Sequence, residues 1–541
     1  MQKYRETGLK LIIASLIIVS FLAGFLLSPL FLRLSSSLFV PGQIGIIEVK
    51  GYVLFPQDLD YLLTLINYAK LNSSIKAVVL DINSGGGSAY AFEQLYYSVR
   101  LLAKTKPVVA SVSGLAASGG YYLAASADYI YATPSSLVGS IGVIASMPSV
   151  VLPTPSVLET GPSKLSGFDL KNFPLQVDEV LKNFLNNVKV ARGSRLNVSA
   201  ATLQKAEIYL GSEAKSLGLV DEIGSLQQAV EKAASLAGIS SYGILILNEL
   251  IPNTFPYSTL AKSPFSQNLT VSFLNEVYPP PAVYCLYSPF LSNYLTQTST
   301  FYFYSDVSSL QSGNDVIIDY AHLNAFSRQE IESLLTKIVL KGYSFSFLTN
   351  SFQLQEKLAN AKVFVVIAPV TSFSDQEVEA IKNFVDRGGK LILISEPLRT
   401  SPDAINSIAY KFSLVFSSGY LYNLINYWGI YRFVVVSNFS KNEAPFTKST
   451  LTSASLFRNI SKIVVMSSSA VYSNNIYEAA YTDNKTYLAV ADKRAQFTPI
   501  VVSYYGRVFA IGSLSMFTQP FISLYDNEKL EDNLLEVALS G

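Results

Sequence analysis

Two segments rich in small residues could support chemistry through the backbone of this 541-residue chain. The first, NSGGGS, runs from Asn83 to Ser88, after an apolar stretch and before a helical pattern. Three consecutive glycines let backbone amides approach a ligand without obstruction by side chains. Phosphate binding is one interpretation, but neither a GK[ST] nor a GxGxxG spacing follows. Taken alone, the segment is better explained as a tight turn between a strand and a helix.

The second segment, SGLAASGGYYLAASA, spans Ser113 to Ala127 and also follows an apolar run. Ser118 lies where a helix should begin, and a hydroxyl there can point into a cleft. A helix N-terminus favours negative charge on a reacting oxygen, so the position suits a nucleophile. The same small residues could instead serve only to let a helix pack closely, and this segment alone leaves both interpretations open.

A nucleophilic serine needs a proton acceptor. The single histidine, His322, follows about two hundred residues later in DYAHLNAF, and we interpret it as a structural residue. The remaining option is a neutral lysine, which requires a pocket of low polarity. Lowering a lysine pKa from about 10.4 to about 8 costs about 3 kcal/mol. Lys164, in ETGPSKLSG, has small and apolar neighbours and is the candidate, although most lysines are solvated surface residues.

The composition excludes several classes of protein. Forty Lys and Arg residues against 39 Asp and Glu residues give a net charge of +1, so no basic field indicates nucleic-acid binding. A single cysteine, Cys285, excludes an internal disulfide framework and a Cys-rich zinc site. Hydrophobic residues make up 50% of the chain and charged residues 15%, which excludes disorder. The chemistry considered above requires no metal and no cofactor.

Strand-like and helix-like patterns alternate in two regions, which predicts two α/β domains with largely parallel strands. In the first region we expect strands at 44–53, 76–83 and 107–113, helices at 59–69 and 88–104, and a turn followed by an amphipathic helix within 215–238. In the second region we expect strands at 316–321, 345–349, 363–369 and 390–397, and helices at 327–341 and 374–387. Ser374 or Asp375 can cap the last helix, which Gly388 and Gly389 should end. The proline-rich stretch 252–300 is interpreted as an irregular connector.

The N-terminal region carries an apolar segment at 11–32 without charged residues. Its 22 residues would reach about 33 Å as a helix, enough to cross a bilayer, so we predict a single uncleaved transmembrane anchor. Lys3, Arg5 and Lys10 precede it, which predicts a cytoplasmic N-terminus at 1–10 and an extracytoplasmic bulk of the chain. Asn-x-Ser/Thr sequons agree with that side of the membrane; they begin at Asn72, Asn197, Asn268, Asn438, Asn459 and Asn484.

Several motifs together resemble the signal peptide peptidase A family of membrane-anchored serine proteases. They are the glycine-rich turn after a strand, ASGGYY (117–122), ADYIYATPSSLVGSIGV (127–143), ARGSR and GSEAKSLGLVDEIG (211–224). The resemblance covers about residues 43–240 and implies a ClpP/crotonase-like fold. It implies that Ser118 is the nucleophile and Lys164 the general base of a Ser/Lys dyad. It further implies that the Gly86 and Gly119 amides form the oxyanion hole and that Ser140 orients the lysine.

Two departures from the family pattern affect these assignments. The family usually has proline where Gly85 stands, which would make this turn less rigid. The stretch between GSIGV and Lys164 is short and rich in proline, where relatives usually have a helix. Lys171 is therefore the fallback for the general base.

The C-terminal region, 301–541, resembles a flavodoxin-like domain of the class I glutamine-amidotransferase type. The resemblance rests on DYAHLNAF, on the segment ending in VDRGGKLILISEP, and on GRVFAIGSLSMFTQPFISLYDNEKLEDNLL (506–535). Members that act on glutamine use a cysteine on a sharp turn after a strand. Cys285 lies instead in the connector at 241–300, so we expect this domain to be non-catalytic.

The predicted function is that of an extracytoplasmic Ser/Lys endopeptidase in the cell membrane. The resemblance implies that it cleaves residual signal peptides or other hydrophobic membrane-derived peptides, and that it forms a ring-like homo-oligomer. One alternative is the NfeD-type protease that partners stomatin, which usually carries further C-terminal spans or a small β-barrel. The other is a non-catalytic assembly scaffold that retains the fold. A nucleotide-binding function ranks last.

Overall fold

The protein folds into two compact α/β units. The computed structural model describes residues 7–8, 10, 12–25, 42–147, 160–161, 164, 167, 169–256, 258–260, 269–278, 282–287, 313–441 and 455–540. The first unit comprises Met1–Val143, Phe184–Asn268 and Tyr284–Ser288, and the second comprises Ile144–Asn183, Leu269–Val283 and Pro289–Gly541.

The predicted anchor at 11–32 is described only in part. Residues 12–25 are helical, and residues 26–32 lie outside the described residues. Among the described residues, no helix is both long enough and apolar enough to cross a membrane.

The first unit is built on a parallel sheet in the order β9-β1-β2-β3-β4-β8. Its strands are β1 (Gly42–Val53), β2 (Ile75–Ser88), β3 (Val108–Ala117), β4 (Tyr129–Ala132), β8 (Glu222–Ile223) and β9 (Tyr242–Ile246). The strands predicted at 44–53, 76–83 and 107–113 are thereby confirmed. Their β-branched residues are buried because helices cover the sheet, which is typical of parallel strands. Strand β2 continues to Ser88, however, so the interpretation of the NSGGGS segment as a tight turn is wrong.

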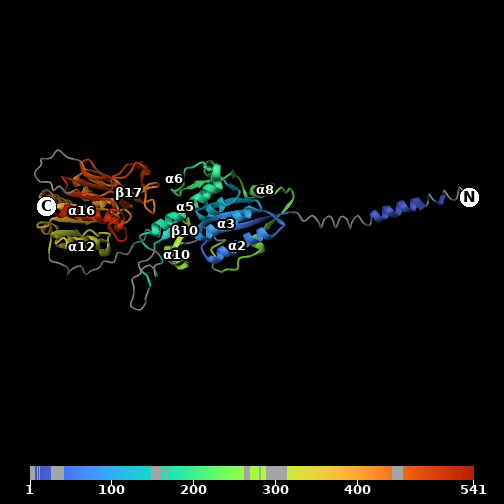
Figure 1. Ribbon diagram of the computed structural model, residues 1–541, viewed down its shortest axis with the longest axis horizontal. Helices are drawn as coiled ribbons and strands as arrows, with labels where there is room; N and C mark the ends of the chain where they lie inside the picture. The colour runs from blue at the N-terminus through green and yellow to red at the C-terminus, as the bar shows by residue number, and fades with distance from the viewer. Residues whose placement is uncertain are drawn as a thin grey trace. The chain divides into compact units, whose positions relative to one another are not determined.

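The first unit contains the helices predicted at 59–69, at 88–104 and within 215–238, together with others that were not predicted. They are α2 (Pro56–Leu71), α3 (Ala89–Ala103), α4 (Gly119–Ala125), α6 (Ala200–Leu203), α7 (Gly211–Ser216), α8 (Leu226–Leu236) and α9 (Leu247–Leu250), with α5 (Phe173–Arg192) shared between the units. Helices α2 and α3 pack against each other (Figure 1). Helix α8 packs on a face that includes Ile44, Ala77 and Val109. Two short strands, β5 (Leu137–Gly139) and β7 (Ile208–Leu210), pair antiparallel beyond the end of β3.

The segment interpreted as an irregular connector contains two regular elements. They are helix α10 (Val271–Val277) and strand β10 (Ala282–Leu286), while residues 279–281 and 288–312 lie outside the described residues. Residues Tyr284 to Leu286 of β10 pair antiparallel with the end of β2. The expectation of an irregular segment is therefore wrong at β10, where five residues without proline can complete a strand. Strand β6 (Ile144–Ser146) is a further short strand.

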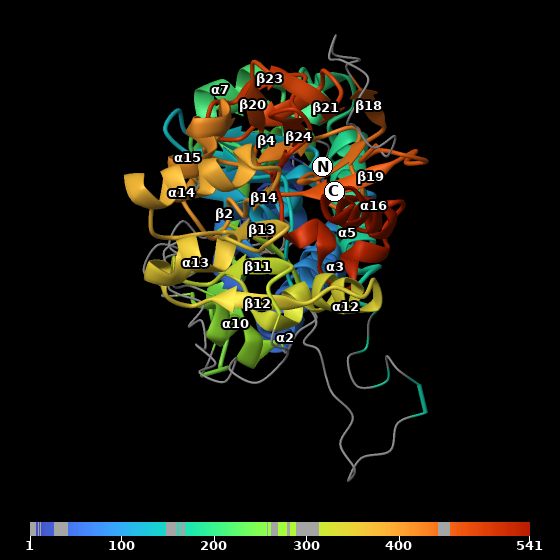
Figure 2. The ribbon, with the colours of Figure 1, turned by 90° about the vertical axis from the view of Figure 1, so that its left-hand side faces the viewer.

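The second unit contains a mixed sheet in the order β12-β11-β13-β14-β25-β24-β21-β18. Its strands are β11 (Val316–Asp319), β12 (Phe345–Leu348), β13 (Val363–Ile367), β14 (Lys390–Ile394), β18 (Asn438–Lys441), β21 (Ile476–Tyr481), β24 (Ile500–Ser503) and β25 (Val508–Ile511). Figure 2 shows β12, β11, β13 and β14 in this order. Alternate residues of β11 enter two separate cores, Ile318 on one face and Ile317 on the other, so this sheet is covered on both sides.

The helices of the second unit are α12 (Glu332–Leu340), α13 (Leu354–Leu358), α14 (Asp375–Asp386), α15 (Pro402–Ala409) and α16 (Asn527–Leu539). Smaller strands pair as β15 (Leu414–Phe416) with β20 (Val471–Ser473), β17 (Phe433–Val436) with β19 (Ile463–Met466), and β16 (Leu421–Asn423) with β22 (Thr486–Leu488) and β23 (Lys493–Ala495). Helices α12 and α16 lie side by side, as Figure 1 shows, and Lys337 and Glu531 form an ion pair of 3.0 Å there. The predicted Ser374 cap of α14 is confirmed, because Ser374 forms a reciprocal capping box with Glu377.

Candidate active site

Ser118 lies on a sharp turn between β3 and α4 in the first unit. Its φ of 53° and ψ of −117° are a sparsely populated conformation for a residue with a side chain. The surrounding structure holds it there: the Ser118 amide donates to Gly139 O at 2.8 Å, and Ser118 Oγ donates to Gly142 O at 3.1 Å. The side chain is almost fully buried. A strained turn that fixes one hydroxyl is the arrangement expected of a nucleophile.

The glycine-rich segment meets this turn directly. A Cβ built on Gly86 would lie 2.7 Å from the Gly119 amide nitrogen, and a Cβ on Gly120 would lie 2.3 Å from Ser84 O. Gly86 has φ +99°, which residues with side chains rarely adopt. The structure therefore brings Gly86, Ser118 and Gly119 together within one unit.

The Gly86 amide is hydrogen-bonded within its own segment. It donates to Ser84 Oγ at 3.1 Å, and Ser84 is fully buried. To stabilise an oxyanion, this amide would have to exchange the Ser84 hydroxyl for the substrate oxygen. Ser84 was not predicted from the sequence, although it stands next to the glycines.

Ser140 lies on the loop that receives Ser118. This loop follows β5, and Ser140 has φ 49° and donates its amide to Glu207 O at 2.7 Å. Gly139 and Gly142, on either side of it, supply the two carbonyl oxygens that accept from Ser118. The backbone of the GSIGV motif thus holds the predicted nucleophile in place.

The two candidate general bases belong to the second unit. Lys164 lies in a turn, where its amide donates to Gly161 O at 3.0 Å and its side chain is exposed. The Lys171 amide donates to Asp169 Oδ1 at 3.0 Å, and Lys171 Nζ lies 3.5 Å from Ser523 O. The pairing of either lysine with Ser118 stays a prediction.

The groups packed beside the turn that carries Ser118 disfavour charge. Phe92 contacts this turn, because a Cβ on Gly119 would lie 2.4 Å from its ring. Burial raises the pKa of the neighbouring Glu93 carboxyl and that of the Cys285 thiol. Burial also raises the pKa of the Tyr122 phenol, whose ring stacks on Phe184 at 4.2 Å. Surroundings that resist ionisation would favour the neutral form of an amine brought into contact with them.

Strand β10 is the main feature of this region that the sequence analysis missed. It lies along Gly86, Gly87 and Ser88, and the Tyr287 amide donates to Gly85 O at 2.7 Å. The run AVYCL between prolines was the available signal, because short apolar runs free of proline are typical of buried strands.

His322 and Cys285 are both buried side chains. His322, in the second unit, is buried with Nδ1 2.9 Å from Asp319 Oδ1, and its ring stacks on Phe373 at 3.5 Å. These contacts agree with the structural role that the sequence predicts. Cys285 is fully buried within β10. Within the described residues, no group of three His, Cys, Asp or Glu side chains could hold a metal ion.

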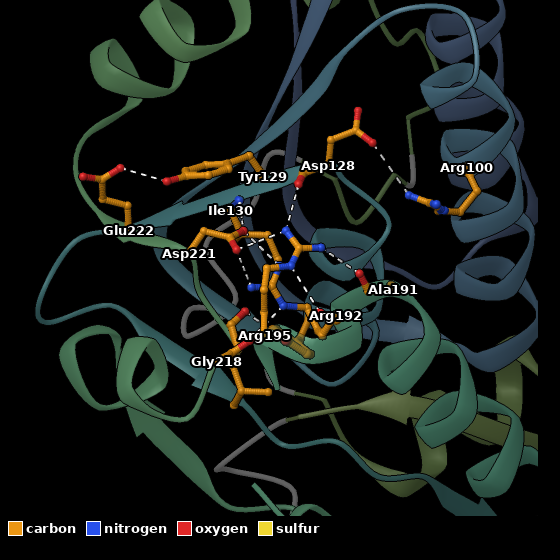
Figure 3. Close-up of polar contacts among 12 residues, drawn as sticks. Arg100, Asp128, Tyr129, Ile130, Ala191, Arg192, Arg195, Gly218, Asp221 and Glu222 are labelled. Atoms are coloured by element: carbon orange, nitrogen blue, oxygen red, sulfur yellow. Dashed lines mark hydrogen bonds and ion pairs between the residues drawn. The ribbon is translucent and has the colours of Figure 1, made fainter. Parts of the chain in front are cut away.

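A buried ion pair fixes the C-terminal part of α5 to the first unit. Arg192, which is fully buried, donates to both carboxylate oxygens of Asp221 at 2.7 and 2.9 Å and to Gly218 O at 2.9 Å (Figure 3). Asp221 also accepts a hydrogen bond from the Ile130 amide at 2.8 Å, and Arg195 Nη1 lies 3.1 Å from Asp221 Oδ1. The ARGSR and GLVDEIG motifs are therefore joined through this pair, in which each buried charge has a partner.

Comparison with known proteins assigns the chain to a family. The sequence matches the family model "Peptidase family S49" over residues 100–151 and 165–240. A Methanocaldococcus jannaschii protein that bears a protease name is 35% identical over 209 residues, which cover 36% of this chain and 67% of that protein. The chain therefore belongs to peptidase family S49, and its class is that of the serine peptidases.

Two longer relatives match the same part of the chain. Protease 4 of Haemophilus influenzae is 33% identical over 218 residues, which cover 36% of this chain and 35% of that protein. The chloroplastic serine protease SPPA of Arabidopsis thaliana is 29% identical over 215 residues, which cover 36% of this chain and 31% of that protein. The match thus spans about a third of the length of these two relatives.

The second unit has a match of its own. Residues 315–417 match the family model "IFT52 GIFT domain". A solved structure named mmIFT52 N-terminal domain has 16% sequence identity and a TM-score of 0.32, and it covers 42% of this chain and 98% of its own.

Proposed function

We propose that this protein is an endopeptidase in which Ser118 is the nucleophile of a Ser/Lys dyad. The observation that carries the proposal is the strained turn that holds Ser118 beside Gly86 and Gly119. The match to peptidase family S49 includes Ser118. Strain of this kind is maintained only where surrounding contacts fix it, and it concentrates at functional sites.

The proposed reaction begins with attack of Ser118 Oγ on the carbonyl carbon of the scissile peptide bond. A neutral lysine, Lys164 in the first assignment and Lys171 in the second, accepts the hydroxyl proton as the new C–O bond forms. The amides of Gly86 and Gly119 donate to the oxyanion, and Ser140 orients the lysine. The protonated lysine returns its proton to the leaving amine, and water then hydrolyses the acyl-enzyme with the same lysine as base. This scheme requires no metal or cofactor.

We further propose that the protein is anchored in the cell membrane by residues 11–32, with the bulk of the chain outside the cytoplasm. The uncharged apolar run and the basic residues before it support this proposal. Hydrophobic peptides left in the membrane, such as residual signal peptides, are then the proposed substrates. A ring-like homo-oligomer would limit access to unfolded chains.

The C-terminal domain is proposed to be non-catalytic and of the amidotransferase-like type. Ala368, directly after β13, has φ 41° and therefore sits on a sharp turn after a strand. A methyl group at this turn cannot act as a nucleophile, and Cys285 is not part of this domain's sheet. These two observations support a role in binding or assembly.

The proposal is tested by cleavage of a fluorogenic hydrophobic peptide with full-length protein in detergent. We expect Ser118→Ala to abolish cleavage, since the proposal assigns the acyl bond to the Ser118 hydroxyl. Ser113→Ala is the matched control, because Ser113 is an exposed serine of β3, the strand that leads into the turn of Ser118, and this variant should retain cleavage. Cleavage that persists in purified Ser118→Ala protein would overturn the proposal.

The lysine assignment is tested in the same assay across pH. Loss of cleavage in Lys164→Ala with retention in Lys171→Ala supports the first assignment, and the reverse result supports Lys171. Activity of the unaltered protein should rise with pH, because only the neutral amine accepts a proton. Retention of full activity in both variants would contradict a dyad that uses either lysine.

A further inference from the structure

Strand β10 lies on the same edge of β2 as Ser118. At Gly86 and Gly87, the opposite edge of β2 is occupied by Tyr52 and Val53 of β1. The neighbour on the other side, β3, pairs with β2 only as far as Ser84 and then turns into Ser118. Strand β10 therefore takes the place that β3 leaves, next to the nucleophile.

Strand β10 pairs with β2 through its backbone. Tyr284, Cys285 and Leu286 pair antiparallel with Ser88, Gly87 and Gly86, in that order. The ladder continues at Tyr287, whose amide donates to Gly85 O at 2.7 Å and whose carbonyl accepts from Tyr52 Oη at 3.2 Å.

The glycines permit this close approach. A Cβ on Gly85 would lie 2.6 Å from Tyr287 O, and a Cβ on Gly86 would lie 2.0 Å from Cys285 O. The same position on Gly86 is 2.7 Å from the Gly119 amide nitrogen. The main chain of Cys285 therefore lies beside both glycines assigned to the oxyanion hole.

An extended peptide that reached Ser118 would need this edge. Peptides bind to exposed strand edges through the same ladder of main-chain hydrogen bonds, and one edge accepts one strand. Two further groups are held by internal partners: Ser118 Oγ donates to Gly142 O, and the Gly86 amide donates to Ser84 Oγ.

We propose that β10 is a built-in occupant of the substrate-strand site, and that a substrate peptide binds by displacing it. The proposal rests on the proposed function, because it assigns this edge to the substrate. It describes an autoinhibited resting state, in which the apparent affinity for a peptide is reduced by the small fraction of molecules in which β10 has left the edge.

The only cysteine of the chain reports on this displacement. Cys285 is fully buried in β10, so a thiol reagent reaches it only when the strand leaves. The test uses full-length Ser118→Ala protein in detergent, alkylated with iodoacetamide. The probe is a blocked hexapeptide, Ala-Val-Tyr-Ser-Leu-Tyr, which copies residues 282–287 with serine in place of cysteine. We expect the probe to raise the alkylation rate of Cys285 several-fold, with saturation.

Two variants of Tyr287 separate the effect of its backbone hydrogen bond from the effect of its side chain. Tyr287→Pro and Tyr287→Ala both remove the phenol, but only proline removes the amide that donates to Gly85 O. Without the probe, we expect Cys285 in Tyr287→Pro to be alkylated about fivefold faster than in Tyr287→Ala, the factor that corresponds to one neutral hydrogen bond. Circular dichroism melting must show both variants folded.

The possible outcomes separate this inference from the proposed function. If the probe does not change the alkylation rate of Cys285, and the rate is equal in the two Tyr287 variants, the role proposed for β10 is wrong. This holds even if a fluorophosphonate labels Ser118 in protein that retains the serine. Alkylation that responds as expected, with Ser118 unlabelled in every variant, overturns the proposed nucleophile and leaves β10 as the cover of a peptide-binding edge.

Discussion

The backbone around Ser118 is fixed by contacts that leave no space for added atoms. Ser118 keeps its positive φ because its amide and hydroxyl both bind the loop from Gly139 to Gly142. Gly120 lies against Ser84 O, so the turn that carries the nucleophile and the glycine-rich segment hold each other in place. Residue-scale packing is therefore part of the proposed chemistry, because a nucleophile has to be held within a small error of its reacting position.

We expect Gly120→Ala to disturb this contact. The added Cβ would lie 2.3 Å from Ser84 O, a backbone atom that cannot rotate away. The free energy of unfolding should fall by about 1–3 kcal/mol, the range for overpacked sites, and labelling of Ser118 by a fluorophosphonate should slow. The control is Gly243→Ala in β9, where the nearest atom is Gln43 Cγ at 4.0 Å. Urea denaturation measures the stability, and equal stability of the two variants would contradict this account.

At the scale of elements, the sequence predicts the strands and helices that bury apolar residues at a regular spacing. The first three strands and α14 with its Ser374 cap were predicted within a few residues. Strand β10 was not, because its pairing with β2 depends on residues almost two hundred positions away. The proposed lysine partner of Ser118 could not be derived from spacing either, since spacing within one strand or helix says nothing about a base in a separate segment.

The Arg192–Asp221 pair is expected to stabilise the end of α5 strongly. Arg192→Ala leaves the Asp221 carboxylate buried without its main partner, which typically lowers the free energy of unfolding by about 3–5 kcal/mol. Arg100→Ala is the control, because Arg100 and Asp128 form a solvent-exposed pair 3.9 Å apart that should contribute about 0–1 kcal/mol. Chemical denaturation of both variants tests this difference. Equal losses of unfolding free energy in the two variants would show that burial does not determine how much these ion pairs contribute to stability.

At the scale of the whole molecule, the candidate residues are divided between the two units. Ser118, Gly86 and Gly119 belong to the first unit, whereas Lys164 and Lys171 belong to the second. The second unit also contains buried carboxyl groups that make its stability depend on pH. Burial raises the pKa of Glu396, which accepts hydrogen bonds from the Ser515 amide and hydroxyl.

This shift predicts how stability changes with pH. Because folded Glu396 holds its proton more tightly than the unfolded chain does, its contribution is present below its ordinary pKa of 4.5 and is lost as pH rises through the raised value. Glu396→Gln has no carboxyl group to titrate at this position. The free energy of unfolding of the variant, taken relative to that of the unaltered protein, should therefore be higher at about pH 8 than at about pH 4.5. Urea denaturation at both pH values is the measurement.

Glu330 provides a control of opposite sign. Burial acts to raise its pKa, but hydrogen bonds and charge from Arg399 outweigh burial and leave the pKa below its ordinary value. Its contribution is therefore present above pH 4.5 and lost as pH falls, so Glu330→Gln should be more destabilising at about pH 8 than at low pH. If the relative free energy of unfolding of both variants changed in the same direction with pH, these charge assignments would be wrong.

The central claim is that Ser118 is a nucleophile, and covalent labelling tests it most directly. Full-length protein in detergent would be treated with a fluorophosphonate, digested and analysed by mass spectrometry. We predict one phosphonate per chain, attached to Ser118 and absent from the Ser118→Ala variant. Folded protein that stays unlabelled, or that carries the phosphonate at another residue, would contradict the claim.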